Sequence, residues 1–168
     1  MTFNRRVGTL FGLILISLNI SCDQLTKTMV RNQISPHERI ILISDHLTLT
    51  NIENSGAFLS MGQTWWQPVK SLLFIVLPII VLLFGLFYMT RLGGKQPWLT
   101  FALGFAIGGG IGNMIDRLLY GSVTDFVHIR VGPLQTGIFN MADVSITIGV
   151  GMMLLFALRG RRQEFMPH

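Results

Sequence analysis

The sequence is poor in charge and in cysteine. Only 12% of the 168 residues are charged and half are hydrophobic, whereas about a quarter of a soluble globular domain is charged. Together with a mean hydropathy of +0.55, this composition excludes an ordinary soluble domain. It predicts an integral membrane protein with one membrane domain over residues 1–168. The single cysteine, Cys22, excludes an internal disulfide and leaves the redox environment open.

Motifs of several enzyme classes are also missing. There is no HExxH zinc motif and no GK[ST] phosphate-binding loop. Asp125 and His128 stand three residues apart, but the other histidines are isolated, so we expect no metal. Ser55 lies in NSGAF without the preceding glycine of an intramembrane GxSG motif. A serine nucleophile activated by Lys27 or Lys70 stays open as an alternative.

Positive charge is not concentrated in one stretch. The formal net charge is +5, but the Lys and Arg residues are scattered along the chain. We therefore expect no nucleic-acid partner, and interpret these residues as flanks of membrane segments that meet anionic lipid.

Four apolar segments are candidates to cross a bilayer, which takes about 20 helical residues. They cover about residues 7–22, 69–89, 97–116 and 138–158. The first could be a cleaved signal peptide, but Asn19 replaces the leucine-like residue expected three positions before Cys22, so we expect a retained span. Pro78 predicts a kink in the second span. Five glycines in the third span permit close approach of another helix: Gly104, Gly108, Gly109, Gly110 and Gly112.

The connection of residues 23–68 is mostly polar or alternating. Residues 40–43 are apolar and residues 47–50 alternate, so both predict short strands separated by a turn. Trp65 and Trp66 indicate return to the membrane interface. The predicted fold class is an all-α membrane protein. It has four transmembrane helices, a small extracytoplasmic β-sheet between the first and second, and a second extracytoplasmic loop at about 117–137.

The basic residues predict the orientation. Seven of them crowd into the terminal flanks and the short connection at 91–95, while six are spread over the two long loops. By the positive-inside rule both termini are cytoplasmic. Five polar residues from four different segments then face the opposite side: Asp23, Asn54, Asp116, Asp125 and Asp143.

Acidic residues near a membrane core are costly and usually functional. Two carboxylates in a partly dry site can share one proton, so that one acts as a base and the other as an acid. Asp125 and Asp143 are the best candidates, because each ends a turn-like segment at a membrane boundary. Asp116 competes, but its neighbour Arg117 predicts a charge-paired, structural acid.

The remaining polar residues give weaker signals. Asp23 and Lys27 have the spacing of a helical ion pair. Three asparagines beside glycine or acidic residues are suited to orienting a peptide backbone or a carboxylate, although asparagine is also common in turns. They are Asn54, Asn113 and Asn140.

Five short segments, in this order, resemble the lipoprotein signal peptidase family, the signal peptidase II of bacteria. They are DQLTK (Asp23 to Lys27), NSGAF (Asn54 to Phe58), GGGIGNMIDR (Gly108 to Arg117), VTDF (Val123 to Phe126) and FNMAD (Phe139 to Asp143). The resemblance covers nearly the whole chain. The family often has a second alanine before the phenylalanine of NSGAF, a departure that concerns local loop packing.

The resemblance implies a membrane aspartyl endopeptidase that cleaves the signal peptide from diacylglyceryl-modified bacterial prolipoproteins just before the lipidated cysteine. It implies Asp125 and Asp143 as the catalytic pair, no metal or cofactor, and inhibition by the cyclic peptide globomycin. The expected partners are lipid-modified prolipoproteins and membrane lipids, and the expected location is the bacterial cytoplasmic (inner) membrane. Other matching residues would bind substrate or support the pair: Asp23, Lys27, Asn54, Gly56, Asn113, Asp116, Arg117, Asn140 and Ala142.

Two other function classes stay open on the residues alone. A small proton-coupled carrier could use intramembrane acids as a relay, and a structural partner protein could use them to hold helices together. A carrier would transport without shortening a substrate. In a structural protein, Asp125→Asn would damage folding rather than activity alone.

Overall fold

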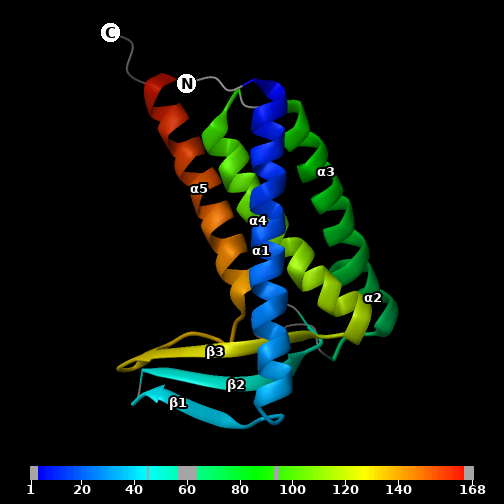
Figure 1. Cartoon of the computed structure of the whole chain (residues 1–168), viewed down its shortest axis with the longest axis vertical. Coiled ribbons are helices and arrows are strands. Elements are labelled where there is room, and N and C mark those ends of the chain that lie inside the picture. Colours follow the sequence, from blue (N-terminus) through cyan, green and yellow to red (C-terminus); the bar gives the residue numbers. More distant parts are fainter. Residues whose placement is uncertain (1–3, 45, 57–63, 93–94, 165–168) are drawn as a thin grey trace.

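A bundle of long helices stands on a small sheet (Figure 1). The computed structural model describes residues 4–44, 46–56, 64–92 and 95–164. Its elements follow one another in the order α1 (Arg5–Gln33), β1 (Arg39–Ile43), β2 (Leu47–Asn54), α2 (Gln67–Ser71), the π-helical turn η2 (Leu72–Val76), α3 (Leu77–Leu92), α4 (Pro97–Tyr120), β3 (Val123–Val131), β4 (Leu134–Gln135) and α5 (Met141–Glu164). Both termini lie at the end of the bundle opposite the sheet.

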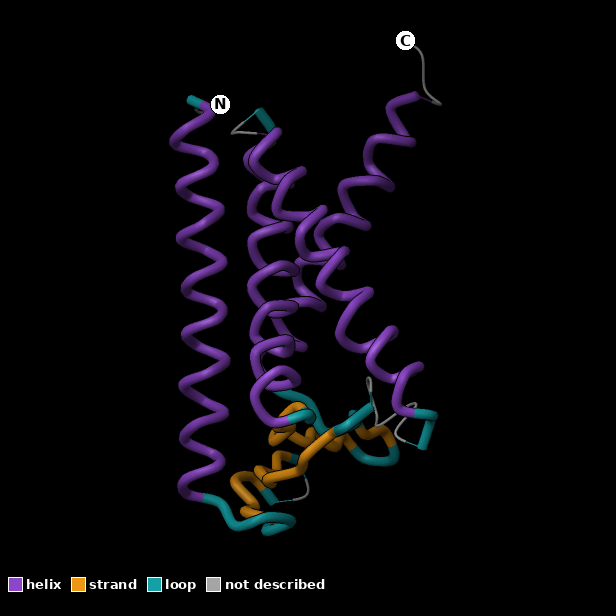
Figure 2. Tube along the Cα trace, turned by 90° about the vertical axis from the view of Figure 1, so that its right-hand side faces the viewer, coloured by secondary structure: helices purple, strands orange, loops and turns teal. Residues whose placement is uncertain are grey.

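Four helical segments are long and apolar enough to cross a membrane. They are Arg5–Gln33, Gln67–Leu92, Pro97–Tyr120 and Met141–Arg159. The apolar window of α4 is 56% buried, against 6% for the segment formed by α2, η2 and α3. The difference makes α4 the packed centre of the bundle, and Figure 2 shows the helices running side by side down to the sheet. The chain is a multi-pass membrane protein.

Helix α1 is longer than the predicted span of residues 7–22. It continues through Asp23 and Lys27 to Gln33, and the chain turns extended at Ile34. The helix ends there because Pro36, two residues further on, disfavours helical backbone before it. The residues of the DQLTK motif therefore lie on α1, and not in the loop predicted after residue 22.

The second spanning segment contains the π-helical turn η2. Pro78 follows this turn by two residues, and its missing N–H cannot bond to the carbonyl of Phe74, inside η2. Helices deviate where their backbone ladder loses a hydrogen bond. The structure therefore places an irregular turn just before the proline.

Glycines let α4 approach its neighbours, as predicted from the sequence. A Cβ atom on Gly112 would lie 2.6 Å from Oδ2 of Asp23 in α1, and one on Gly109 would overlap the carbonyl oxygen of Ala142 in α5. Neither approach leaves room for a side chain. Within the GGGIG segment, α1 packs against Gly108 and Gly112, and α5 packs against Gly109.

The sheet is larger than expected from the first connection alone. The predicted strands at 40–43 and 47–50 correspond to β1 and β2, but β3 and β4, from the connection between α4 and α5, complete an antiparallel sheet in the order β1-β2-β3-β4. A bulge in β2 lies between Leu49 and Ile52 where it pairs with β3. The segment 117–137, predicted as a loop, thus holds the strand that carries Asp125.

Candidate active site

Asp125 lies near the start of β3 and is held by two amides. Its side chain is only 4% exposed. Asn54, at the end of β2, donates from Nδ2 to Oδ2 at 2.9 Å. Asn140 donates from Nδ2 to Oδ1 at 2.6 Å. Since both oxygens accept a hydrogen bond, the carboxyl group is fixed in orientation.

Asp143 lies in the first turn of α5, where it closes a reciprocal cap with Asn140. The backbone N–H of Asp143 donates to Oδ1 of Asn140 at 3.0 Å, and the backbone N–H of Asn140 donates to Oδ2 of Asp143 at 3.2 Å. This is the geometry of a capping box, with asparagine and aspartate in the two positions. The positive end of the helix dipole also favours a negative charge here.

Asn140 therefore joins the two carboxyl groups. Its side-chain amide bonds to Asp125 through nitrogen and caps Asp143 through oxygen. Phe139 next to it is bridged to Val127 of β3. One residue between β4 and α5 sets the relative position of acids that are eighteen positions apart in the sequence.

Burial dominates the electrostatics of Asp125. Loss of hydration raises the pKa of its carboxyl group to about 6; the hydrogen bond from Asn54 opposes this rise, and the charge of Asp143 adds to it. A carboxyl group with this pKa keeps a proton more readily than an exposed aspartate does. Asp125 can thus donate a proton near neutral pH.

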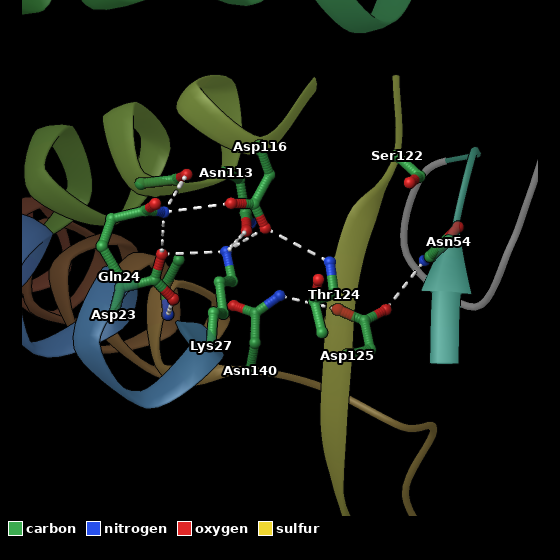
Figure 3. A network of polar contacts seen from close by, with 12 residues as sticks. Asp23, Gln24, Lys27, Asn54, Asn113, Asp116, Ser122, Thr124, Asp125 and Asn140 are labelled. Carbon is green, nitrogen blue, oxygen red and sulfur yellow. Dashed lines mark hydrogen bonds and ion pairs between the residues drawn. The ribbon is translucent and has the colours of Figure 1, made fainter. Parts of the chain in front are cut away.

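A second group of polar residues is buried between α1 and α4 (Figure 3). At its centre is Lys27, whose side chain is fully buried. Its Nζ lies 2.8 Å from Oδ2 of Asp23 and 3.1 Å from Oδ2 of Asp116, and donates to Oδ1 of Asn113 at 2.9 Å. The Asp23–Lys27 ion pair expected from the spacing is present. Two carboxylates and one amide oxygen compensate the buried ammonium group.

Asn113 connects this cluster to the acidic pair. While its oxygen accepts from Lys27, its Nδ2 donates to Oδ1 of Asp143 at 2.9 Å. The ammonium group fixes which end of the amide faces Asp143, because Lys27 can only donate. Asp143 thus receives a donor from α4 as well as its own helix cap.

The partner of Asp116 differs from the one predicted. Adjacent residues on a helix point in different directions, and Asp116 bonds to Lys27 and to Arg31, whose NH2 group lies 2.8 Å from Oδ1. Arg117 turns away and donates to the carbonyl oxygen of Gly56 at 3.2 Å. Asp116 is charge-paired, as expected, but with α1 and not with its neighbour.

Arg117 supports the segment that presents Asn54. The backbone N–H of Gly56 donates to Oδ1 of Asn54 at 3.0 Å, while its carbonyl accepts from Arg117. The charge of Arg117 also interacts with Asp143 and Asp125. Ala57 and Phe58, the last residues of the NSGAF motif, lie outside the described residues.

Asp23 ties α1 to the start of α5. Its Oδ1 accepts from the backbone N–H of the buried Ala142 at 2.9 Å. All residues predicted for the site are therefore in or beside one connected group, formed by α1, β2, α4, β3 and α5.

Sequence reasoning missed Gln24, Arg31 and Thr124. Nε2 of Gln24 donates to both Asp23 and Asp116, and Nε of Arg31 donates to Oγ1 of Thr124 at 2.8 Å. Arg31 stands four residues after Lys27 and eight after Asp23, so all three share a helix face. The signal was present, but it required a first helix that continues beyond Cys22.

No metal-binding group is formed by the described residues. Among them, no set of three His, Cys, Asp or Glu side chains is arranged to hold an ion. His128, the histidine closest in sequence to Asp125, lies further along β3 and lines a cavity that includes neither Asp125 nor Asp143. The chemistry of this site is that of two carboxyl groups held by amides.

This arrangement has counterparts in known proteins. The model of the family described as signal peptidase (SPase) II matches residues 15–159. The chain belongs to the signal peptidase II family. A lipoprotein signal peptidase of Pseudomonas putida is 32% identical over 167 residues, covering 97% of this chain and 95% of that protein. One of Brevibacillus brevis is 37% identical over 142 residues, covering 84% and 91%.

Solved structures agree with this membership. A bacterial membrane enzyme determined by the in meso method at 2.3 Å resolution superimposes with a TM-score of 0.81, at 26% identity, covering 95% of this chain and 93% of that one. A second, at 1.9 Å resolution, gives a TM-score of 0.78 at 25% identity and covers 88% and 92%. The fold of this signal peptidase II member is thus shared over nearly its whole length.

Proposed function

We propose that this chain is an aspartyl endopeptidase that removes the signal peptide from diacylglyceryl-modified prolipoproteins, cutting just before the lipidated cysteine. Membership of the signal peptidase II family supports cleavage of lipoprotein signal peptides. The observation that supports the aspartyl mechanism most directly is that the side chain of Asn140 forms hydrogen bonds with both Asp125 and Asp143. Two carboxyl groups held close together by one amide side chain are suited to sharing one proton.

The surroundings of the two acids favour different roles. Asp143 is half-buried at the N-terminus of α5 and accepts hydrogen bonds from Nδ2 of Asn113 and from the backbone N–H of Asn140. Asp125 is more deeply buried, and its pKa of about 6 favours the protonated form. We therefore assign Asp125 as the acid of the pair and Asp143 as the base.

The reaction follows from these roles. Asp143 takes a proton from water, and the water oxygen attacks the carbonyl carbon of the scissile peptide. The proton on Asp125 goes to the leaving nitrogen as the C–N bond breaks, which releases the lipidated cysteine with a free amino group. Asn54 and Arg117 would position the substrate backbone, since Asn54 bonds to Asp125 and Arg117 bonds to the carbonyl oxygen of Gly56, two residues after Asn54.

The position of the pair suits a lipid-modified substrate. Asp125 and Asp143 belong to the region where the helices meet the sheet, at the end of the bundle opposite the termini. We place the termini on the cytoplasmic side of the inner membrane, so that the pair faces outward. A signal peptide could then diffuse laterally to the bundle, with its acyl chains still in the membrane.

The serine alternative loses one of its two candidate lysines. Lys27 is fully buried and compensated by two carboxylates and an amide oxygen, so it has no lone pair to offer Ser55. Only Lys70 would be left for that role. Support for the aspartyl mechanism is correspondingly stronger.

The test is cleavage of a diacylglyceryl-modified prolipoprotein by purified protein, followed as a gel shift. Asp125→Asn and Asp143→Asn should each reduce the rate by at least about a thousandfold, because each removes one partner of the acid–base pair. Thermal melting of both variants should show a folded protein. Globomycin should inhibit the wild-type protein.

Glu53→Gln provides the matched control. Glu53 neighbours Asn54 in β2, but its carboxylate bonds to Thr124 and Ser122 instead of the acidic pair, so the variant should still cleave. If Asp125→Asn and Asp143→Asn cleave as well as Glu53→Gln, the aspartyl mechanism is wrong. If the wild-type protein never cleaves, the proposed function itself is wrong.

A further inference from the structure

A cavity of about 410 Å³ opens on the sheet, apart from the acidic pair. This volume is within the range of about 300–1,000 Å³ that is usual for small-ligand sites. The cavity extends across β1, β2 and β3 to the segment after β4. Its polar lining includes Arg39, Thr48, Thr50, His128, Arg130 and Gln135.

The strand register places the cavity on the sheet face that does not carry the acidic pair. Arg39 pairs with Thr50, and Thr48 pairs with His128, so these four side chains project from the same face. Side chains alternate along a strand, and Asp125 is three residues before His128 on β3. The cavity is therefore a site separate from the one that holds the two carboxyl groups.

Two guanidinium groups flank the cavity and form no ion pair with any acid among the described residues. The three ion pairs formed by the described residues all belong to the cluster around Lys27 and Asp116, and none includes Arg39 or Arg130. Arg130 uses Nε for the carbonyl oxygen of Gly132 at 3.3 Å, and its terminal nitrogens bond to no other residue in the described part of the chain. Two arginines on one cavity match an anion that accepts several hydrogen bonds, such as a phosphate.

The hydroxyl group of Thr50 is the second indication of a ligand. Thr50 is only 3% exposed, and its Oγ1 has no hydrogen-bond partner among the described residues. Buried polar groups nearly always have partners, because leaving one unsatisfied is costly. Since Thr50 lines the cavity, an oxygen atom of a ligand there would complete its hydrogen bonding.

Exposed apolar side chains at both margins of the sheet indicate that a phosphate bound in this cavity would belong to a lipid. Ile41 and Ile43 on β1 are 67% and 57% exposed, and Val131 and Leu134 at the β3–β4 hairpin are 60% and 75% exposed. The sheet also lies directly at the ends of the membrane-crossing helices (Figure 2). An apolar margin around a cationic centre is the pattern of a surface that rests in the lipid headgroup region.

We propose that this cavity binds the phosphate of an anionic phospholipid headgroup. The guanidinium groups of Arg39 and Arg130 would hold the phosphate oxygens, and the hydroxyl group of Thr50 would donate to one of them. The exposed isoleucines and Leu134 would contact the acyl region beside it. Bound lipid would then fix β3, and with it Asp125, against the membrane.

The experiment titrates phosphatidylglycerol into the detergent-solubilised full chain and follows binding by native mass spectrometry. Arg39→Gln/Arg130→Gln should bind this lipid at least about tenfold more weakly than wild type, because two charge-assisted contacts to phosphate are lost. The matched control is Lys70→Gln/Lys95→Gln, which removes the same charge elsewhere and should bind as wild type does.

Two further ligands identify the source of the phosphate. Phosphatidylcholine has a phosphate but no net charge, and inorganic phosphate has no acyl chains. Both should bind at least about tenfold more weakly than phosphatidylglycerol. Equal binding of phosphatidylcholine would contradict selection for anionic lipid, and equal binding of inorganic phosphate would contradict a lipid site.

Thr50→Val separates a ligand contact from a structural role. Valine has nearly the shape of threonine but lacks the hydroxyl group, so the variant without lipid should melt at the same or a higher temperature. Its affinity for phosphatidylglycerol should fall several-fold. Unchanged affinity would show that the hydroxyl group does not contact the headgroup.

A peptide is the competing occupant of the cavity. The KM for prolipoprotein is therefore measured in nanodiscs made only of phosphatidylcholine. The lipid proposal expects Arg39→Gln/Arg130→Gln to match wild type there. A KM raised several-fold by this variant would assign the cavity to the polypeptide substrate and overturn the lipid proposal, as would equal phosphatidylglycerol affinity for the variant and its control.

Discussion

At the scale of single residues, several ionisable side chains of this protein are buried. Asp23, Lys27 and Asp116 have no exposed side-chain surface, and Asp125 has very little. Such groups are stable only when their charges are compensated or when they keep a proton. The charge of Lys27 is compensated, whereas Asp125 tends to keep a proton. The two residues should therefore respond differently to mutation and to pH.

Asp125 should make stability depend on pH. Its pKa in the folded chain, about 6, is above the ordinary value of 3.8, so the folded state holds the proton more tightly than the unfolded state. The contribution of Asp125 to stability is therefore fully present below about pH 4 and is lost as the pH rises through 6. The loss is about 3 kcal/mol for a shift of this size.

Thermal melting at several pH values measures this effect. Between pH 4 and pH 7 the wild-type protein should lose stability relative to Asp125→Asn, which has no proton to release. The difference between the two proteins removes the contribution of the other titrating groups. Parallel melting curves over this pH range would show that the carboxyl group is not perturbed.

Lys27 should be needed for folding. Lys27→Met retains the apolar stem but leaves Asp23 and Asp116 without the ammonium group that lies within about 3 Å of both. Breaking a buried ion pair costs about 3–5 kcal/mol, so the melting temperature in detergent should fall sharply. Lys70→Met, at a half-buried lysine of α2, is the control and should melt within a few degrees of wild type.

At the scale of elements, α4 organises the molecule. Its glycines admit α1 and α5 at distances that exclude any side chain, and its polar residues bond to both helices through Asn113 and Asp116. The geometry of the acidic pair is therefore set by helix packing. A small change at the contact between α1 and α4 should therefore alter the geometry of the acidic pair.

Gly112→Ala tests this dependence. The added Cβ would lie 2.6 Å from Oδ2 of Asp23, so α1 must move or the carboxylate must leave Lys27. Stability should fall by about 1–3 kcal/mol, the usual cost of overpacking, together with activity. Gly151→Ala on α5 is the control, because its Cβ would meet nothing within 4 Å.

Melting and cleavage should be measured on both glycine variants. Gly151→Ala should be neutral or slightly stabilising, since alanine favours the helix by up to about 1 kcal/mol. If Gly112→Ala melts and cleaves like Gly151→Ala, the α1–α4 approach does not constrain the site.

At the scale of the whole molecule, the two ends of the bundle differ. The sheet and the acidic pair lie at one end, and the connection at Lys95 lies with the termini at the other. The dense basic flanks at the second end predict that it faces the cytoplasm. This orientation determines from which side a substrate could be cut.

Cysteine labelling in intact cells checks the orientation. In a Cys22→Ser background, a membrane-impermeant maleimide should label Ser44→Cys, at the exposed β1–β2 turn, and should not label Lys95→Cys. Both should be labelled after the cells are opened. The reverse pattern in intact cells would place the sheet in the cytoplasm.

The sequence by itself determined the class of the molecule and one buried ion pair. Apolar length predicted the four membrane-crossing helices, alternation predicted β1 and β2, and the spacing of Asp23 and Lys27 predicted an ion pair that is present. These features depend on local patterns of a few residues. The ordered motifs resembling signal peptidase II located the family that the comparisons establish.

Only the tertiary structure decided how these residues are connected. Arg31 replaces Arg117 as a partner of Asp116, β3 joins a sheet expected from the first connection alone, and Asn140 bonds to both Asp125 and Asp143. Such pairings join positions far apart in the chain, and they depend on which faces meet when α1, α4 and α5 pack. Local periodicity carries no information about that choice, because it is made by the close approach of whole helices.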